Sequence, residues 1–360
     1  LLKKSAGTGT AQIYRPFINT GTVNVESGTL TLSAGGTNFN IITVPSGTAL
    51  RFQGNYTLAP GSSLTGAGQV IFDSGTIGVD GTYNITGTNA FIGATVNFIG
   101  SYTLDGLHFH LQSGTVFLPN ALSVPQLTIS SGTLNSSNTI TVSGPLNFVG
   151  GSLTGAGDIF ANGGVSLTGG SLKSLTGHRL INAATFTWAA GQLNLGAGSV
   201  LTNLVSGTVD WQVDTSLGNP GGVATVGNAG LWRKVAGNGN STIDRPFVNT
   251  GTVEVQTGTL YFSDTLVQTA GNTFLNGGNV RSDLPLRIEG GSLSGFGTVI
   301  GSVTNNGAVS PGTSPGQLTV QGTYTQTTNG VLNIDLAGAP NTTNNDRLVV
   351  TGTAVLAGTL

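Results

Sequence analysis

The densest group of carboxylates in the chain is the segment TVDWQVD, which carries Asp210 and Asp214. On a β-strand alternate side chains share a face, so Asp210, Gln212 and Asp214 would point one way and the indole between them the other. Paired carboxyls catalyse glycoside hydrolysis when they lie about 5 to 9.5 Å apart, whereas four residues of strand separate these Asp Cα atoms by about 13 Å. We therefore expect a solvated face above a buried Trp211. A partner carboxylate from a neighbouring strand is the alternative that would make this protein an enzyme.

The segment HFH places His108 and His110 on one strand face about 6.6 Å apart, a spacing that a metal ion can bridge. No third ligand is near them, and the remaining histidine is His178. Calcium-binding nonapeptides of the GGxGxD kind do not occur in the sequence. We interpret the pair as polar surface residues, and we predict no catalytic residue, no metal site and no cofactor.

Two arginines and two tryptophans stand in settings that could bind a ligand. Arg15 and Arg245 each precede a Pro-Phe pair, and we interpret them as corners between strands, because Pro fixes φ at a strand entrance and Phe can fill a core. A binding motif is the alternative. Trp188 and Trp232 would have to be exposed to stack on sugars, and we expect them in the core instead.

The segments that position these side chains are short runs of alternating apolar and polar residues. They recur about every 7 to 12 residues and are separated by Gly, Asn and Ser. Examples are TVNV, QVIF, TVFL and VLNI. We find no run of ten or more residues with apolar positions at helical spacing. The sequence therefore predicts an all-β protein with little or no helix.

A long duplication shows which way the side chains point. Residues 1–33 and 231–263 share 19 identities in 33 positions. Alternate positions stay apolar between the copies, so these should face inward on period-two strands. The inward set is Val23, Val25, Leu30 and Leu32, with Val253, Val255, Leu260 and Phe262 in the second copy. The positions between them vary freely, so Asn24, Glu26 and Thr31 should face solvent.

Other phrases recur outside this period, which indicates that one structural unit is used many times. SSLTGAGQVIF, GSLTGAGDIF and GSLSGFGTVIG are variants of one phrase. Strands this short cannot bury a face alone, and units that bury apolar rows against their neighbours are typical of solenoids. We predict a right-handed parallel β-helix of about 14 to 18 coils, each of about 20 to 25 residues, with ladders of stacked Asn or Thr. An antiparallel sandwich array is the alternative fold.

The duplication also predicts the domain organisation. Residues 1–230 would form one β-solenoid repeat unit, and residues 231–360 a second, partial copy. We expect one continuous rod that is a fragment of a longer protein. The chain contains no Met, and it ends in TGTAVLAGTL, which resembles the middle of a pattern.

Low charge excludes several classes of protein. Charged residues make up 7% of the chain and the formal net charge is -2, whereas about 25% charged residues is usual in soluble domains. Nucleic-acid binding needs clustered Lys and Arg, and the basic residues here are scattered. There is no Cys, no signal peptide and no apolar run of the length, about 18 residues, that spans a bilayer. We predict no nucleic-acid partner and no membrane span.

The strongest family signal lies in residues 299–360. Its motifs are SPGTSPGQLTV, GTYTQ, VLNIDLAG and NDRLVVTGTAVLAGTL. With these motifs the stretch resembles the carboxyl-terminal part of autotransporter passenger domains and related repeat proteins of the bacterial surface. The resemblance implies a right-handed parallel β-helix displayed outside the cell, whose terminal stretch helps it to fold during secretion.

Together these features lead us to expect a non-enzymatic, extracellular structural protein of a bacterial surface or fibre. Neither end of the chain carries a polar capping unit, so we expect the protein to associate with itself, end to end or laterally. A carbohydrate-binding adhesin that contacts surface glycans or other cells is the alternative. A polysaccharide-active β-helix enzyme is a further one, and it would need carboxylates or basic residues clustered along one groove.

Overall fold

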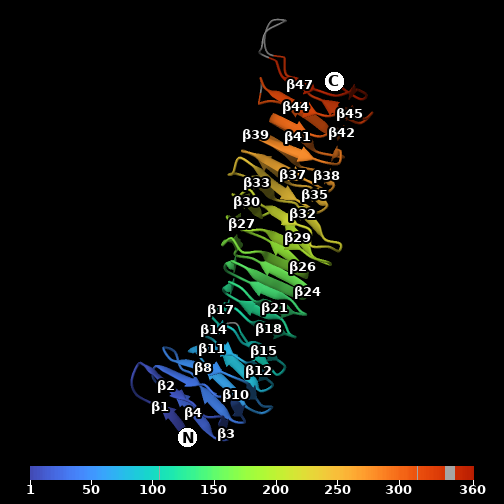
Figure 1. Cartoon of the computed structure of the whole chain (residues 1–360). Helices are drawn as coiled ribbons and strands as arrows, with labels where there is room; N and C mark the ends of the chain where they lie inside the picture. The colour runs from blue at the N-terminus through green and yellow to red at the C-terminus, as the bar shows by residue number, and fades with distance from the viewer. Residues whose placement is uncertain (105, 314, 337–344) are drawn as a thin grey trace. The chain divides into compact units, whose positions relative to one another are not determined.

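The computed structural model describes residues 1–104, 106–313, 315–336 and 345–360. All elements formed by these residues are β-strands, and none of them is a helix that could cross a membrane. The strands stack in parallel as a β-solenoid of about 16 turns (Figure 1). The all-β prediction and the predicted number of coils are confirmed, and the antiparallel array is wrong. Of the stretch with the family resemblance, residues 314 and 337–344 lie outside the described residues.

The chain divides into two compact units. Unit 1 comprises Leu1–Ser166 and Lys173–Arg179, and unit 2 comprises Leu167–Leu172 and Leu180–Leu360. Two strands, β25 (Val165–Leu167) and β26 (Lys173–Asn182), contain the divisions. This division by packing is separate from the 230-residue period of the sequence, which stays a prediction about domains.

Unit 1 has three rows of strands, and each strand generally pairs with the third strand further along the chain. The first row is β1 (Leu2–Lys4), β4 (Thr22–Val25), β7 (Ile41–Thr43), β10 (Ser63–Gly66), β13 (Thr82–Ile85) and β16 (Tyr102–Thr103), followed by the pair β19 (Leu122–Val124) and β22 (Ile140–Val142). The second row is β2 (Thr10–Ile13), β5 (Thr29–Leu32), β8 (Ala49–Gln53), β11 (Gln69–Ser74), β14 (Thr88–Phe91), β17 (His108–Leu111), β20 (Leu127–Ile129) and β23 (Leu146–Phe148). The third row is β3 (Phe17–Asn19), β6 (Gly36–Asn38), β9 (Tyr56–Leu58), β12 (Thr76–Val79), β15 (Thr95–Phe98), β18 (Thr115–Leu118), β21 (Thr133–Ser136) and β24 (Gly151–Ala161).

Unit 2 repeats the three-row plan. One row is β27 (Thr185–Trp188), β30 (Thr208–Trp211), β33 (Leu231–Lys234), β36 (Thr252–Val255), β39 (Asn272–Ser282), β41 (Ser292–Ile300), β43 (Ala308–Pro311) and β46 (Val331–Leu332). The next is β28 (Leu193–Leu195), β31 (Ser216–Gly218), β34 (Asn240–Ile243), β37 (Thr259–Phe262), β44 (Gln317–Gln321) and β47 (Arg347–Val350), with β39 and β41 taking part in both rows. The last is β29 (Val200–Asn203), β32 (Thr225–Asn228), β35 (Phe247–Asn249), β38 (Leu266–Gln268), β40 (Leu286–Ile288), β42 (Val303–Asn305), β45 (Tyr324–Gln326) and β48 (Ala354–Val355).

The register of the strands sets the length of a coil. Thr10 pairs with Thr29, 29 − 10 = 19 residues on, and Val200 pairs with Thr225, 225 − 200 = 25 residues on. These offsets agree with the predicted coil of about 20 to 25 residues. Equivalent side chains of successive coils therefore lie one strand spacing apart, which is about 4.8 Å.

The core follows the pattern read from the duplication. All eight apolar positions predicted to face inward are buried, with exposed fractions of 3% or less. One prediction on the outer face is wrong, because Thr31 is buried at 3% exposure. Thr31 stands between Gln12 and Arg51 on the neighbouring strands of its row. These longer side chains cover the hydroxyl, an effect that the sequence of a single coil does not reveal.

A ladder of buried amides runs through unit 2 and confirms the prediction of stacked Asn. The Nδ2 atoms of Asn182, Asn203 and Asn228 each donate to the Oδ1 atom of the next Asn along the ladder at 2.8 Å. Asn249 continues the series by donating to Oε1 of Gln268 at 3.2 Å. Each of these side chains is at most 1% exposed. Buried amides need partners, and here the next coil supplies them.

Replacing one member of this ladder should destabilise unit 2. Asn228→Ala removes the acceptor of Asn203 and the donor to Asn249, and leaving buried amides unpaired costs about 2 to 4 kcal/mol. All three Trp residues lie in unit 2, so their fluorescence during urea titration reports its unfolding. The matched control, Asn240→Ala, changes an exposed Asn on β34 and should shift the free energy of unfolding by less than about 0.5 kcal/mol. Equal effects of the two changes would show that the ladder is not needed.

Candidate functional site

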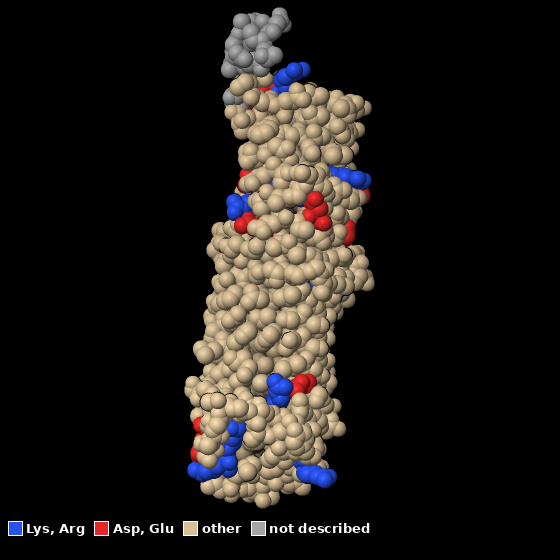
Figure 2. Space-filling model, turned by 60° about the vertical axis from the view of Figure 1, so that its left-hand side comes forward, with Lys and Arg blue, Asp and Glu red and all other residues tan. Residues whose placement is uncertain are grey.

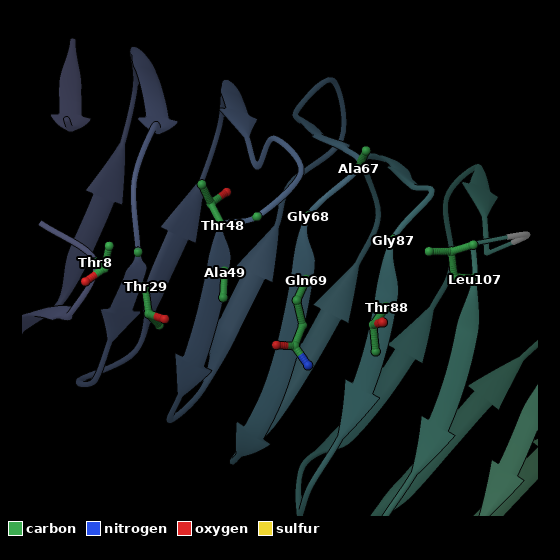
Figure 3. A pocket seen from close by; sticks show the side chains of 12 residues that line it. Thr8, Thr29, Thr48, Ala49, Ala67, Gly68, Gln69, Gly87, Thr88 and Leu107 are labelled. Atoms are coloured by element: carbon green, nitrogen blue, oxygen red, sulfur yellow. The ribbon is translucent and has the colours of Figure 1, made fainter. Parts of the chain in front are cut away.

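A groove runs along one corner of unit 1, where the chain enters the second row of strands (Figure 3). Its volume is about 400 Å³. Residues at matching places in successive coils line it, among them Thr29, Ala49, Gln69 and Thr88. The groove thus offers hydroxyl, amide and backbone groups, repeated at the spacing of the coils.

Glycines form the floor of this groove because the coils meet closely at the corner. Gly28 has a φ of 60°, and a Cβ atom added there would lie 2.5 Å from the carbonyl oxygen of Gly9. At Gly87 the added atom would lie 2.0 Å from the carbonyl oxygen of Gly68. Neither position has room for a larger residue. Peptide groups rather than side chains therefore face a ligand in the floor.

A second hollow of about 380 Å³ continues from the groove onto the outer face of the second row. Thr29, Ala49 and Gln69 line both hollows. The second hollow adds Gln12 and Arg51. We call the groove and this hollow together the polar groove of unit 1.

Hydrogen bonds between coils hold the side chains of the second hollow in place. Gln12 Nε2 donates to Ser33 Oγ at 2.5 Å, and that hydroxyl donates to Gln53 Oε1 at 3.1 Å. Gln53 Nε2 donates to Asp73 at 2.6 Å, and Arg51 forms an ion pair with the same carboxylate at 3.3 Å. Because this pair is neutral overall, the polar groove suits an uncharged polar ligand.

The histidine pair lies further along the same row, on β17. As predicted, His108 and His110 share the outer face, and their rings stack with centroids 5.3 Å apart. Their Nε2 atoms are 2.9 Å from Thr128 Oγ1 and 3.1 Å from Ser130 Oγ respectively. Partial burial lowers the pKa of both imidazoles, and the neighbouring His110 lowers that of His108 further.

The described residues include no group of three or more His, Asp or Glu side chains that could hold a metal ion. His178, the third histidine, is buried, and its Nδ1 atom is 3.2 Å from the carbonyl oxygen of Gly157. The predicted absence of a metal site stays a prediction.

The two carboxylates of TVDWQVD do not share a strand face, so this part of the sequence prediction is wrong. Strand β30 ends at Trp211, which is fully buried as expected, and Asp214 lies beyond it in a bend. Asp210 faces outward and forms an ion pair with Arg233 on the next coil. The chain turns a corner of the coil after Trp211, and this turn takes Asp214 out of the alternation that a straight strand would continue.

Asp214 instead pairs with a buried lysine. Lys234 is fully buried, and its Nζ atom donates to Asp214 Oδ1 at 2.7 Å, to the carbonyl oxygen of Ala236 at 2.9 Å and to Ser241 Oγ at 3.0 Å. The amide of Gly239 donates to the other carboxylate oxygen at 2.8 Å. Burial acts to raise the pKa of Asp214, but the hydrogen bonds from Lys234 and Gly239 and the charge of Lys234 outweigh it, so this pKa lies below its usual value.

The tryptophans lie in the core, as expected, and do not form a sugar-binding surface. Trp188 and Trp211 stack with centroids 4.1 Å apart, and Trp232 meets Trp211 edge-on at 6.1 Å. All three side chains are fully buried. Their neighbours on adjacent strands are therefore other aromatic rings and not solvent.

Arg15 and Arg245 both stand in bends just before a strand, which confirms that they mark corners. Their surroundings differ, because Arg15 is exposed and Arg245 is 2% exposed. Arg245 donates to the carbonyl oxygens of Leu195, Gly221 and Gly222.

The polar groove was missed from the sequence. Its signal is a Gly directly before the first residue of a strand, as in Gly28-Thr29 and Gly87-Thr88. The same dipeptide occurs at many other corners of the chain, so sequence alone does not tell which corners line up into a groove. Only the register of the coils selects them.

Comparison with known proteins gives one relative and no family. No family model matches the chain, and no solved structure matches it. A protein of Escherichia coli (strain K12), printed as "Uncharacterized protein YuaQ", is 30% identical over 173 residues. This match spans 46% of the present chain and 11% of the relative. The chain is thus similar to a small part of a much larger protein.

The pair of Asp214 and Lys234 should make unit 2 sensitive to acid. Because the pKa of Asp214 is lowered in the folded state, its ion pair stabilises unit 2 above the unfolded pKa of about 4, and this stability is lost as the pH falls through the folded pKa. Asp214→Asn should therefore lower the urea midpoint of Trp fluorescence at neutral pH, and the difference from wild type should shrink near pH 2. Glu289→Gln, which breaks a largely exposed pair with Arg287, should have little effect at either pH. A difference that stays constant with pH would contradict this reading of Asp214.

Proposed function

We propose that the chain is a non-enzymatic structural module of a bacterial cell surface, which acts outside the cell as a scaffold or spacer and associates side by side with further copies. The observation that carries this proposal is the parallel stack of short coils. Each coil adds about 4.8 Å of stack for roughly 20 residues, which is an economical way to gain length and outer surface. The extracellular location is supported by the low charge and by the resemblance of residues 299–360 to passenger domains.

The surroundings of the carboxylates support a role without catalysis. Asp210 is paired with Arg233, and Asp214 with Lys234, so neither is placed to be a proton donor. Asp158 is held by Arg179 through two hydrogen bonds, at 2.9 and 2.6 Å. A general acid in glycoside hydrolysis needs a raised pKa, whereas a neighbouring cation favours the charged form.

The outer surface is poor in charge on the face that Figure 2 shows. Lys, Arg, Asp and Glu occur there in a few separate groups, with wide uncharged areas between them. The paired charges are mostly at half-exposed positions on neighbouring coils, as for Lys3 and Glu26 at 2.8 Å. Such pairs contribute little stability, so the coils depend on their core and backbone pairing.

A second candidate function is the binding of a neutral glycan, and the polar groove of unit 1 favours it. Its lining is uncharged, or neutralised as in the pair of Arg51 and Asp73, and it is open along several coils. The spacing of equivalent groups, about 4.8 Å, is close to the rise of one hexose in an extended β-linked chain. Each coil could then present one hydroxyl or amide to each sugar.

The structural proposal predicts where the native protein is found. Antibodies raised against the chain should label intact cells of the bacterium that produces it, and added protease should remove this label without lysing the cells. The purified chain should form oligomers in light scattering as its concentration rises, and acidic polysaccharides incubated with it should release no reducing ends. Labelling only after lysis would overturn the surface location, and release of reducing ends would overturn the non-enzymatic role.

The glycan proposal predicts binding that depends on the polar groove. On an array of neutral and charged glycans, the chain should retain linear neutral ones, and Gln69→Ala should weaken this binding about fivefold, the effect of one lost hydrogen bond. The matched control is Thr57→Ala, which changes an exposed residue on β9 in the third row. Binding that both variants reduce equally, or retention of charged glycans only, would argue against the groove as the site.

A further inference from the structure

The two copies of the duplicated sequence have different neighbours, and this difference defines a surface. In unit 2, strand β33 of the second copy pairs with β30 on one side and β36 on the other. The equivalent strand in unit 1, β1, has β4 as its one partner among the described strands. The same holds for β2 and β3, which pair with β5 and β6. We call the uncovered side of β1, β2 and β3 the β1–β3 face.

Side chains that are fully covered in the second copy are partly open in the first. Trp232 and Ile243 are fully buried, whereas their counterparts Leu2 and Ile13 are half-buried. A hollow of about 390 Å³ lies beside Leu2, Ile13 and Leu30 at this end of unit 1. In the second copy the matching apolar face is filled, for example by Trp211 against Trp232. The β1–β3 face thus has the apolar side chains of a buried coil interface.

The buried lysine of the second copy has an unpaired counterpart in the first. Lys4 occupies the position of Lys234 and is 9% exposed. Its Nζ atom donates to the carbonyl oxygens of Ala6 and Gly7 at 3.1 and 2.8 Å, and it forms no ion pair within the described part of the chain. In the second copy, Asp214 of the preceding coil supplies that carboxylate. A buried ammonium group without an anion is costly, so Lys4 is suited to receive one.

The arginine at the corner shows the same difference. Arg245 donates to carbonyl oxygens of Gly221, Gly222 and Leu195, all contributed by preceding coils. Arg15 stands in the same bend before the same Pro-Phe pair and is exposed. Its guanidinium is therefore free to meet carbonyl groups that approach the β1–β3 face.

From this comparison we propose that the β1–β3 face is a docking surface for one further coil of the kind formed by residues 208–230. The coil joins ahead of Leu1 in the same polypeptide, as Gly230 joins Leu231. It carries apolar residues at the places of Val209 and Trp211, and a carboxylate at the place of Asp214 that pairs with Lys4. This inference concerns an interface, and it holds or fails independently of where the protein acts.

The test extends the full chain by the coils whose fit is known. Residues 180–230 are placed directly ahead of Leu1, which recreates the junction found before Leu231. Amide hydrogen exchange is then measured for Leu2–Lys4, Thr10–Ile13 and Phe17–Asn19, the three strands of the face. Pairing with a new coil should slow their exchange by about a hundredfold or more relative to the native chain. Unchanged exchange would overturn the proposal.

A control of equal length separates docking from a mere extension. In it the added segment carries Val209→Asp and Asp214→Asn, which remove an inward apolar side chain and the anion for Lys4. This variant should leave the exchange of the face as fast as in the native chain. Lys4→Met should reduce the protection in the extended chain and have little effect on the native chain. Protection that survives both changes would contradict the proposed contacts.

A disulfide gives a second measurement that does not depend on stability. The chain contains no Cys, and Asp210 pairs in register with Arg233, the counterpart of Lys3. Asp210→Cys in the added segment and Lys3→Cys should therefore form a bond within one chain, because neighbouring strands at about 4.8 Å meet the geometric requirement. Failure to form it under oxidising conditions would overturn the register. Native chains whose β1–β3 amides slow with rising concentration would show that a second copy is the occupant, which also overturns the proposal.

Discussion

Each coil of this protein depends on the coil next to it. Strands of two to five residues, such as β19 and β46, can neither pair their own backbone groups nor bury their own apolar face. In-register parallel stacking meets both needs at once, because the next coil offers a complementary backbone edge and a matching apolar row about 4.8 Å away. The stability of each unit is then a sum of contacts between neighbouring coils.

The same dependence explains how the interior of unit 2 tolerates polar groups. The Asn ladder and Lys234 are fully buried, yet each finds its partner on an adjacent coil or corner. A polar group of this kind fixes the register, because a slip of one residue would leave both partners unpaired. The buried polar groups are therefore part of what makes the coils stack in one way.

The outer surface is less constrained, and function is sought there. The corner glycines bring the backbones of successive coils close together, and this close approach creates the floor of the polar groove. The side chains above it repeat with the coil spacing, which suits a ligand that is itself a repeat. The coupling of groove to stack means that the site exists only when several coils are aligned.

The sequence by itself determined the class of fold, because alternation in runs such as TVNV and TVEV and the variation between the two copies show which side chains face inward. It also placed Trp211 in the core and Arg245 at a corner, since both follow from the local pattern. Tertiary structure alone decided that Thr31 is covered, that Asp214 leaves the strand to meet Lys234, and which corners form the polar groove. The physical reason is that these features depend on which residue stands in the neighbouring coil. That register is set by coil lengths that vary from 19 to 25 residues, as for Thr10 with Thr29 and Val200 with Thr225, and local propensity does not encode it.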